Sequence, residues 1–264
     1  VSGLYFYDGE SCGNFDAILG VLGQSLGASG LTREVTGCNN SESWAAYAQM
    51  NYDVTDKLSL SLGARYTDEE KTAFVNNGLV FANVYPYTDW IDGYVRPDGQ
   101  LVPQVLGTDT DGDDVLDAPA VESWSRFTPR VGVEYQMDRD TMFFASYSQG
   151  FKSGTFNPRA QTNEPGVEPE VVDSFEVGVK SDLTDALRMN ITLFSYDHKD
   201  RQYIGVEGDL SDPTALDQRL RNAAETAAKG AELEMTWVAT DNLQFDVAYG
   251  YIDFEIKKNN AIPP

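Results

Sequence analysis

Positive charge is scarce in this 264-residue sequence, which has 19 Lys and Arg residues against 42 Asp and Glu residues, a formal net charge of -23. Such a chain has nothing to offset a phosphate backbone, so nucleic-acid binding is excluded. Long apolar runs are also absent, because no stretch reaches the roughly 18 residues of a transmembrane helix. The chain opens on Val1-Ser2-Gly3 without an initiator Met or a signal peptide, which suggests that an upstream segment is missing.

Histidine is nearly absent, and this restricts both metal binding and catalysis. His198 is the only histidine, so a multi-histidine metal site is impossible, and we expect it on the surface where a strand leaves for a loop. A Ser–His–Asp triad would have to use His198, and nothing in the sequence places a Ser beside it. The pair Glu232 and Glu234 fits an acidic wall better than glycosidase acids. We therefore predict no catalytic residue and no enzyme.

Cysteine occurs twice, as Cys12 and Cys38, in one region rich in Gly, Ser and Asn. The two residues either form a disulfide that closes a loop, which requires an oxidising compartment, or remain as thiols. The disulfide is the favoured interpretation, and it would stabilise the loop by about 3 kcal/mol.

What the sequence does contain is aromatic residues, at 12% of the chain, and a period-two alternation of apolar and polar residues. Such alternation predicts β-strands with one apolar face. The clearest run has Leu58, Leu60, Leu62, Ala64 and Tyr66 on one face and Ser59, Ser61, Gly63, Arg65 and Thr67 on the other. With Val1–Asp8 counted as the end of an earlier strand, the pattern predicts nine strands.

Short and long connections alternate between these strands. Four pairs are joined by tight turns that contain Asp, whose side chain can bond the local backbone. The long polar connections are residues 9–42, 68–122, 153–169 and 200–219, and Asp16 to Leu31 is apolar enough for a short helix. Pro129 would forfeit a hydrogen bond within a ladder, so it predicts a bulge or the start of a strand.

A soluble β-sandwich would also alternate, but three features favour a membrane barrel. The apolar faces carry no charged residue, aromatic residues gather near strand ends, and short turns alternate with long loops, as in outer-membrane barrels. The polar faces carry mid-strand charges, which can pair inside a wet or plugged lumen. Four glycines on these faces would make room for a plug or for neighbouring side chains: Gly150, Gly178, Gly230 and Gly250.

Several dispersed stretches resemble the barrel of TonB-dependent outer-membrane receptors. They are Leu60–Thr67, Phe127–Tyr135, Phe144–Gly154, Pro169–Lys180, Phe194–Gln202 and Lys229–Glu234. The resemblance covers roughly residues 43–256, in the order of the family. It implies a 22-stranded barrel, filled by an N-terminal plug, that imports a scarce nutrient such as an iron–siderophore with energy from the TonB complex.

The predicted fold class is therefore all-β: a partial, antiparallel, up-and-down transmembrane β-barrel with about nine strands of a larger one. Residues 1–264 would form a single partial barrel domain, without the plug and without the C-terminal strand. The expected location is the outer membrane of a Gram-negative bacterium. The expected partners are outer-membrane lipid, the TonB complex through the missing plug, and a small nutrient ligand.

One acidic stretch is a candidate metal site. Asp109, Asp111, Asp113 and Asp117 fall at relative positions one, three, five and nine, the spacing of oxygen ligands in a loop that wraps Ca²⁺. Asp114 stands at the sixth position, where such loops need Gly for a sharp turn. A calcium site and a solvated acidic loop both remain open, and no other cofactor is expected.

Two other functions compete with nutrient import. A passive porin would share the barrel but would not need TonB, and a plug domain encoded upstream would distinguish the two. A soluble calcium-binding β-sandwich or adhesin would be recovered from detergent-free buffer, where a membrane barrel would not. The sequence does not identify the substrate.

Overall fold

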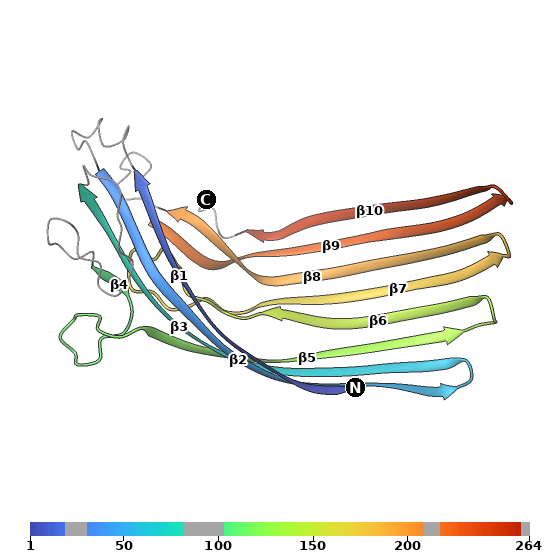
Figure 1. Ribbon diagram of the computed structural model, residues 1–264, viewed down its shortest axis with the longest axis horizontal. Coiled ribbons are helices and arrows are strands. Elements are labelled where there is room, and N and C mark those ends of the chain that lie inside the picture. Colours follow the sequence, from blue (N-terminus) through green and yellow to red (C-terminus); the bar gives the residue numbers. More distant parts are fainter. Residues whose placement is uncertain (19–30, 82–102, 208–216, 260–264) are drawn as a thin grey trace.

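The structure, a computed structural model, describes residues 1–18, 31–81, 103–207 and 217–259. Within these ranges ten strands form one antiparallel sheet (Figure 1). The strands are β1 (Ser2–Ile18), β2 (Leu31–Thr55), β3 (Leu58–Phe81), β4 (Gln104–Leu106), β5 (Ala120–Gln136), β6 (Thr141–Lys152), β7 (Glu170–Thr184), β8 (Leu187–Glu207), β9 (Asp217–Thr240) and β10 (Leu243–Asn259). The nine predicted strands are present, and β4 is an additional short one.

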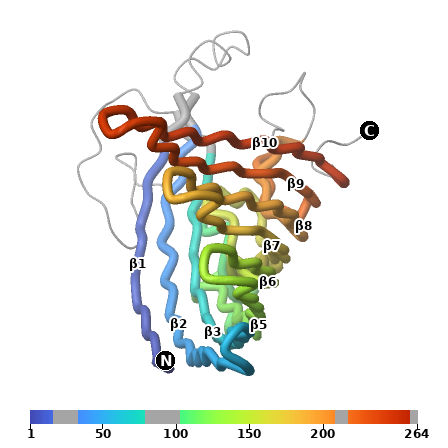
Figure 2. The backbone as a smooth tube through the Cα atoms, turned by 90° about the vertical axis from the view of Figure 1, so that its right-hand side faces the viewer, coloured from blue at the N-terminus to red at the C-terminus, as the bar shows by residue number. Residues whose placement is uncertain are grey.

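The order of strands in the sheet is β1-β2-β3-β5-β6-β7-β8-β9-β10, with β4 paired to β3. Each long strand thus pairs with the next along the chain, which is the predicted up-and-down topology. The sheet curves into an open trough, and β1 and β10 are its two edge strands (Figure 2). A soluble sandwich would need two packed sheets, whereas the described residues form only one, so the barrel prediction is confirmed over the sandwich alternative.

The strands run further than the sequence predicted. Part of each long connection predicted at 9–42, 68–122 and 200–219 lies instead in strands, namely in β1 to β5, β8 and β9. The alternation of side chains continues there, but polar residues occupy both faces, so an apolar face no longer marks the strand. The predicted helix from Asp16 to Leu31 was wrong at both ends, because Asp16–Ile18 and Leu31 are strand residues; residues 19–30 lie outside the described ranges.

No helix in the described part of the chain is long and apolar enough to cross a membrane. The four tight turns gather at one end of the sheet, and the described longer connections, residues 107–119 and 153–169, lie at the other end (Figure 1). In the β5–β6 turn, Asp138 Oδ1 accepts the Asp140 N–H at 2.9 Å, as predicted. In the other three turns a threonine hydroxyl accepts the local N–H instead: Thr55, Thr184 and Thr240.

The pairing register joins the apolar faces of all long strands into one surface. Leu62, for example, pairs with Met50 on β2 and with Val131 on β5. We call this surface the outer face. Its uncharged part, which we call the apolar band, extends from the tight turns to the aromatic residues Trp44, Phe127 and Phe175. Its side chains are exposed in the isolated chain, at 58% for Phe127 and 55% for Phe175. Lipid is the environment that suits such a surface.

The opposite surface, the inner face, carries the polar residues. Gly178 pairs with Phe144 and Gly230 with Phe194, and a Cβ at either glycine would collide with the partner ring. These two glycines therefore make room for neighbouring side chains, as predicted, whereas Gly150 and Gly250 face open space. Pro129 marks neither a bulge nor a strand start. It lies just beyond Arg130, where the β5–β6 ladder ends.

Candidate functional site

A compact core covers the inner face at the long-loop end of the sheet. It consists of the buried side chains Val35, Ala73, Val75, Leu106, Trp124, Phe156 and Ala160. Phe156 and Ala160 belong to the segment between β6 and β7, residues 153–169, which we call the strap. The rings of Trp124 and Phe156 meet edge to face, with centroids 6.1 Å apart. Gly154 lies against the Trp124 indole, where a Cβ would collide with the ring, and Gly166 lies close to both this ring and the Glu122 carboxylate.

The strap connects strands that are far apart in the sheet. The Asn77 side chain on β3 donates to Ala160 O at 2.7 Å, and the Asn157 side chain donates to Gln218 O on β9 at 2.6 Å. Four strands lie between β3 and β9 in the sheet order. A segment of this length can reach both β3 and β9 only across the concave side of a curved sheet. The inner face is therefore concave, and the strap crosses it from one side to the other.

Below the strap, the inner face forms a cavity of about 640 Å³. Three cationic side chains, Arg65, Lys71 and Lys152, line it together with the single carboxylate Glu69. Tyr5 and Tyr7 form part of the same wall, and both rings are about half exposed. Strands β1, β2, β3, β5 and β6 therefore line a cavity that is cationic and aromatic within a chain of net charge -23.

The cationic groups differ in how firmly they are held. Lys71 Nζ donates to Gly154 O at 2.8 Å and pairs with Glu69 at 3.2 Å, so it ties the strap to β3. Arg65 bonds Thr67 Oγ1 through Nε at 2.9 Å, and its guanidinium carbon lies 5.3 Å from the centroid of the Tyr5 ring. Arg65 is bonded through Nε alone, whereas Lys71 is held by both the strap and Glu69, so Arg65 is the better candidate to bind a ligand.

A second charged group lies beside the cavity, at the base of the strap. Glu170 is buried, with its Oε1 2.9 Å from Lys152 Nζ and its Oε2 2.6 Å from His198 Nε2. Burial alone would raise the pKa of Glu170, but hydrogen bonds from Lys152, the Gln202 N–H and His198 outweigh it and hold the pKa below its usual value. The expectation of a surface His198 at a strand end was wrong: the residue is half-buried within β8.

The predicted calcium ligands come together in part. Carboxylate oxygens of Asp109, Asp111 and Asp113 lie within 4.8 Å of one another, whereas Asp117 accepts hydrogen bonds from Thr110. Asp109 accepts the N–H groups of Gly112, Asp114 and Asp111, and that of Gly112 does most to lower its pKa. Asp114 has a φ of 66°, the left-handed conformation that the sixth position requires, although it is not Gly. Calcium binding stays a prediction.

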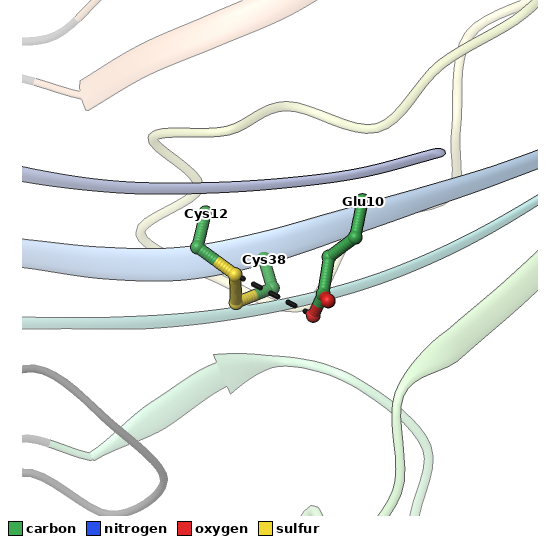
Figure 3. A group of neighbouring side chains, drawn as sticks. All are labelled: Glu10, Cys12 and Cys38. Carbon is green, nitrogen blue, oxygen red and sulfur yellow. Dashed lines mark hydrogen bonds between the residues drawn. A yellow bond between two sulfur atoms is a disulfide. The ribbon is translucent and has the colours of Figure 1, made fainter. Parts of the chain in front are cut away.

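The two cysteines face each other across the β1–β2 ladder and form a disulfide (Figure 3), which confirms the favoured pairing. They lie within paired strands and not in a loop, contrary to the prediction. Glu10 Oε1 lies 3.6 Å from Cys12 Sγ. A disulfide sulfur carries no hydrogen and is a poor metal ligand, so this group is a structural crosslink.

Sequence reasoning missed most of the cavity. Lys71 and Ser153 fell in predicted loops, and Tyr5 and Tyr7 lay in a strand end that we did not assign to a face. One signal was present: Thr67, Glu69, Lys71, Ala73 and Val75 continue the inner-face alternation of β3 past the point where the prediction stopped.

Comparisons with known proteins point to one family. A family model described as "TonB dependent receptor-like, beta-barrel" matches residues 3–263. The chain is 33% identical over 137 residues to the metal-pseudopaline receptor CntO of Pseudomonas aeruginosa, covering 51% of this chain and 18% of that protein. It is 23% identical over 236 residues to the pesticin receptor of Yersinia enterocolitica, covering 86% of this chain and 29% of that protein.

Solved structures agree on the fold. The ferric yersiniabactin uptake receptor FyuA of Yersinia pestis superposes with a TM-score of 0.62 at 16% identity, over 87% of this chain and 32% of that one. The chain thus spans about a third or less of the length of these similar proteins.

Proposed function

Because the chain belongs to the TonB-dependent receptor family, we propose that it forms part of the wall of a receptor that imports a scarce nutrient such as an iron–siderophore. The family consists of Gram-negative outer-membrane receptors and is not an enzyme class. Import in this proposal is a matter of binding and gating. The TonB complex supplies the energy through a plug domain, and no bond in the nutrient is made or broken.

The observation that carries the proposal is the cavity under the strap. Arg65, Lys71 and Lys152 gather there against one carboxylate, although acidic residues outnumber basic ones twofold in the whole chain. Tyr5 and Tyr7 add ring faces on which a flat ligand group can stack. A metal chelate with anionic and aromatic groups is a ligand that this wall would hold.

A passive porin is the second candidate, and the strap argues against it. The strap crosses the concave side at the long-loop end, where it packs into a buried core and is bonded to both β3 and β9. A passive pore needs an open water-filled lumen, whereas a gated receptor is served by a constricted one.

The first test measures ligand binding to the purified full-length receptor. Ferric siderophores of catecholate, phenolate and hydroxamate type would be titrated and followed by quenching of tryptophan fluorescence. We expect Arg65→Gln to weaken binding of the cognate chelate about tenfold, a loss of about 1.4 kcal/mol. Arg130→Gln, on the inner face of β5 and outside the cavity, is the matched control and should bind like wild type.

The second test separates the receptor from the porin. Uptake of the labelled chelate would be measured in cells with and without TonB. A receptor binds its ligand in both strains but accumulates it only with TonB. Equal uptake in both strains would overturn the proposal in favour of a passive channel.

A further inference from the structure

Strand β6 lines the cavity under the strap in a different way from the other strands. Strands β1, β2 and β3 contribute every second residue, such as Tyr5 and Tyr7 on β1 or Ser41 and Ser43 on β2, and so present inner-face side chains. The end of β6 and the first residue of the strap contribute five consecutive residues, 149–153. Successive side chains of a strand point to opposite faces, so this unbroken run shows that the main chain itself bounds the cavity there.

The main chain of β6 is accessible because β5 and β6 separate. Their ladder ends at the pair Arg130 and Ser148, although β6 continues to Lys152 and β5 begins at Ala120. Figure 1 shows β5 extending past the end of β6. The β3–β5 ladder and the β6–β7 ladder both continue to the ends of these strands, so the sheet opens only at the junction between β5 and β6 within this stretch.

The surroundings of the glycines show the same separation. A Cβ at Gly63 or Gly132, which lie within continuous ladders, would have atoms of a neighbouring strand within 4 Å. A Cβ at Gly150 would have nothing within 4 Å, as at Gly250 on the edge strand β10, and Gly150 is exposed. On its β5 side the end of β6 therefore resembles an edge strand, which offers its main chain to another chain.

The β5–β6 turn determines which main-chain groups face the opening. The Met137 N–H donates to Thr141 O at 3.0 Å, so Thr141 directs its main-chain groups toward β5. These directions alternate along an antiparallel strand, so Gln149 and Phe151 face β5 as well. Pro129 lies opposite Gln149 and has no N–H, which leaves the Gln149 carbonyl without a ladder donor. Phe151 forms no ladder pair with β5 in the described part of the chain.

A free strand edge of this kind recognises an extended peptide, which adds to it as a further strand. The Gln149 carbonyl can accept an amide N–H of the ligand, and the Phe151 N–H and C=O can bond the ligand main chain about 7 Å further along. Arg65 lines the same cavity, and its terminal amino groups suit a carboxylate. Main-chain and carboxylate contacts are thus available in one cavity.

We infer that the nutrient bound under the strap is a peptide-type metal chelate. Its extended main chain adds to the free edge of β6 at Gln149 and Phe151, and its carboxylate binds Arg65. This inference rests on the proposed function and narrows its substrate class. A chelate without a peptide main chain has no row of amides to pair with this edge.

The first test compares two ferric chelates on the full-length receptor. One is an N-acetylated linear tripeptide of δ-N-acetyl-δ-N-hydroxyornithine with a free C-terminal carboxylate, whose side chains bind the iron. The other is the same tripeptide with methylated main-chain amides, which has the same iron ligands and charge but cannot pair as a strand. Quenching of tryptophan fluorescence should show that the methylated chelate binds about tenfold more weakly. Equal affinities would overturn the inference.

A pair of variants at Phe151 locates the contact. Phe151→Pro removes the N–H that faces β5 and leaves the β6–β7 ladder intact, because that ladder uses Gly150 and Lys152. Phe151→Ala removes the same ring but keeps the N–H, so it is the matched control. Phe151→Pro should bind the unmethylated chelate about tenfold more weakly than Phe151→Ala does, and the two variants should bind the methylated chelate equally. Equal affinity of the two variants for the unmethylated chelate would contradict the edge contact.

Failure of this inference can be distinguished from failure of the proposed function. A receptor that binds a ferric catecholate through Arg65, but not the peptide chelate, would keep the import function and overturn the peptide class. A receptor that binds no ferric chelate of any class would overturn both. The comparison of the two chelates on the wild-type receptor does not depend on the folding of either variant.

Discussion

The two ends of the sheet are stabilised in different ways. In the apolar band the large side chains point outward and stay exposed within the chain, so the strands are joined by ladder hydrogen bonds and need lipid on one side. At the long-loop end, Trp124, Phe156 and Leu106 are buried against one another, at 7%, 2% and 0% exposure. One half of the fold is completed by the membrane, and the other half has its own core.

The core at the long-loop end determines how the strap behaves when a ligand binds. A segment that folds against its own core is fixed before any ligand arrives, since its contacts do not depend on the ligand. The strap is bonded to β3, β5 and β9 through Asn77, Glu122 and Gln218. We therefore expect the roof of the cavity to be preformed, so that selectivity comes from the wall residues beneath it.

The largest expected effect comes from removing the centre of that core. Trp124→Ala should cost about 3–5 kcal/mol in local stability, as large aromatic truncations in cores do. Hydrogen exchange of the strap amides 154–160 in the full-length receptor would show the loss as faster exchange. Phe127→Ala, three residues along β5 and 58% exposed on the outer face, is the control and should leave strap exchange unchanged. Unaltered exchange in Trp124→Ala would mean that the core does not hold the strap.

In the apolar band, the stability of the barrel should depend on the absence of charge from the outer face. Val247→Arg places a cation on the outer face of β10 at mid-band, where it should cost about 2–4 kcal/mol in folding into lipid vesicles. Ala248→Arg, the next residue, points to the inner face opposite Glu234 and should cost little. Urea titration of the full-length receptor in vesicles gives both values. A similar cost for the two variants would contradict the assignment of faces.

Strands and their faces could be predicted from the sequence in the apolar band but not at the long-loop end, and one physical reason explains both results. In the band, hydrocarbon imposes a strict rule on every second residue, so Leu58 to Tyr66 could be assigned to a strand and a face directly. Above the band both faces meet water or protein, and the rule lapses although the ladder continues through Glu69 and Lys71. The strap could not be predicted at all, since its core joins residues as distant as Val35 and Phe156.

Topology followed from connection lengths, because tight turns permit only adjacent antiparallel strands. The disulfide could be anticipated from Cys12 and Cys38 as the only possible pair, but their place in a strand ladder could not. The three closely spaced aspartates of the 109–117 loop were identified correctly as neighbours, because a local loop brings together residues that are close in sequence.

The smallest expected effect concerns the network at the boundary between the two halves. Hydrogen bonds from Lys199, Gln149 and Tyr147 lower the pKa of Asp173 from 3.8 to about 2. A carboxylate with a lowered pKa contributes stability that is complete above its ordinary pKa and is lost as the pH falls through the lowered value. The urea midpoint of wild type should exceed that of Asp173→Asn equally at about pH 7 and pH 5, and this difference should shrink at about pH 3 and vanish only below about pH 2. Asp185→Asn, at the β7–β8 turn, serves as the control for the general effect of removing a carboxylate. A wild-type advantage that already declines at about pH 5 would show that the network does not hold Asp173 ionised, and that the boundary is no firmer than an exposed surface.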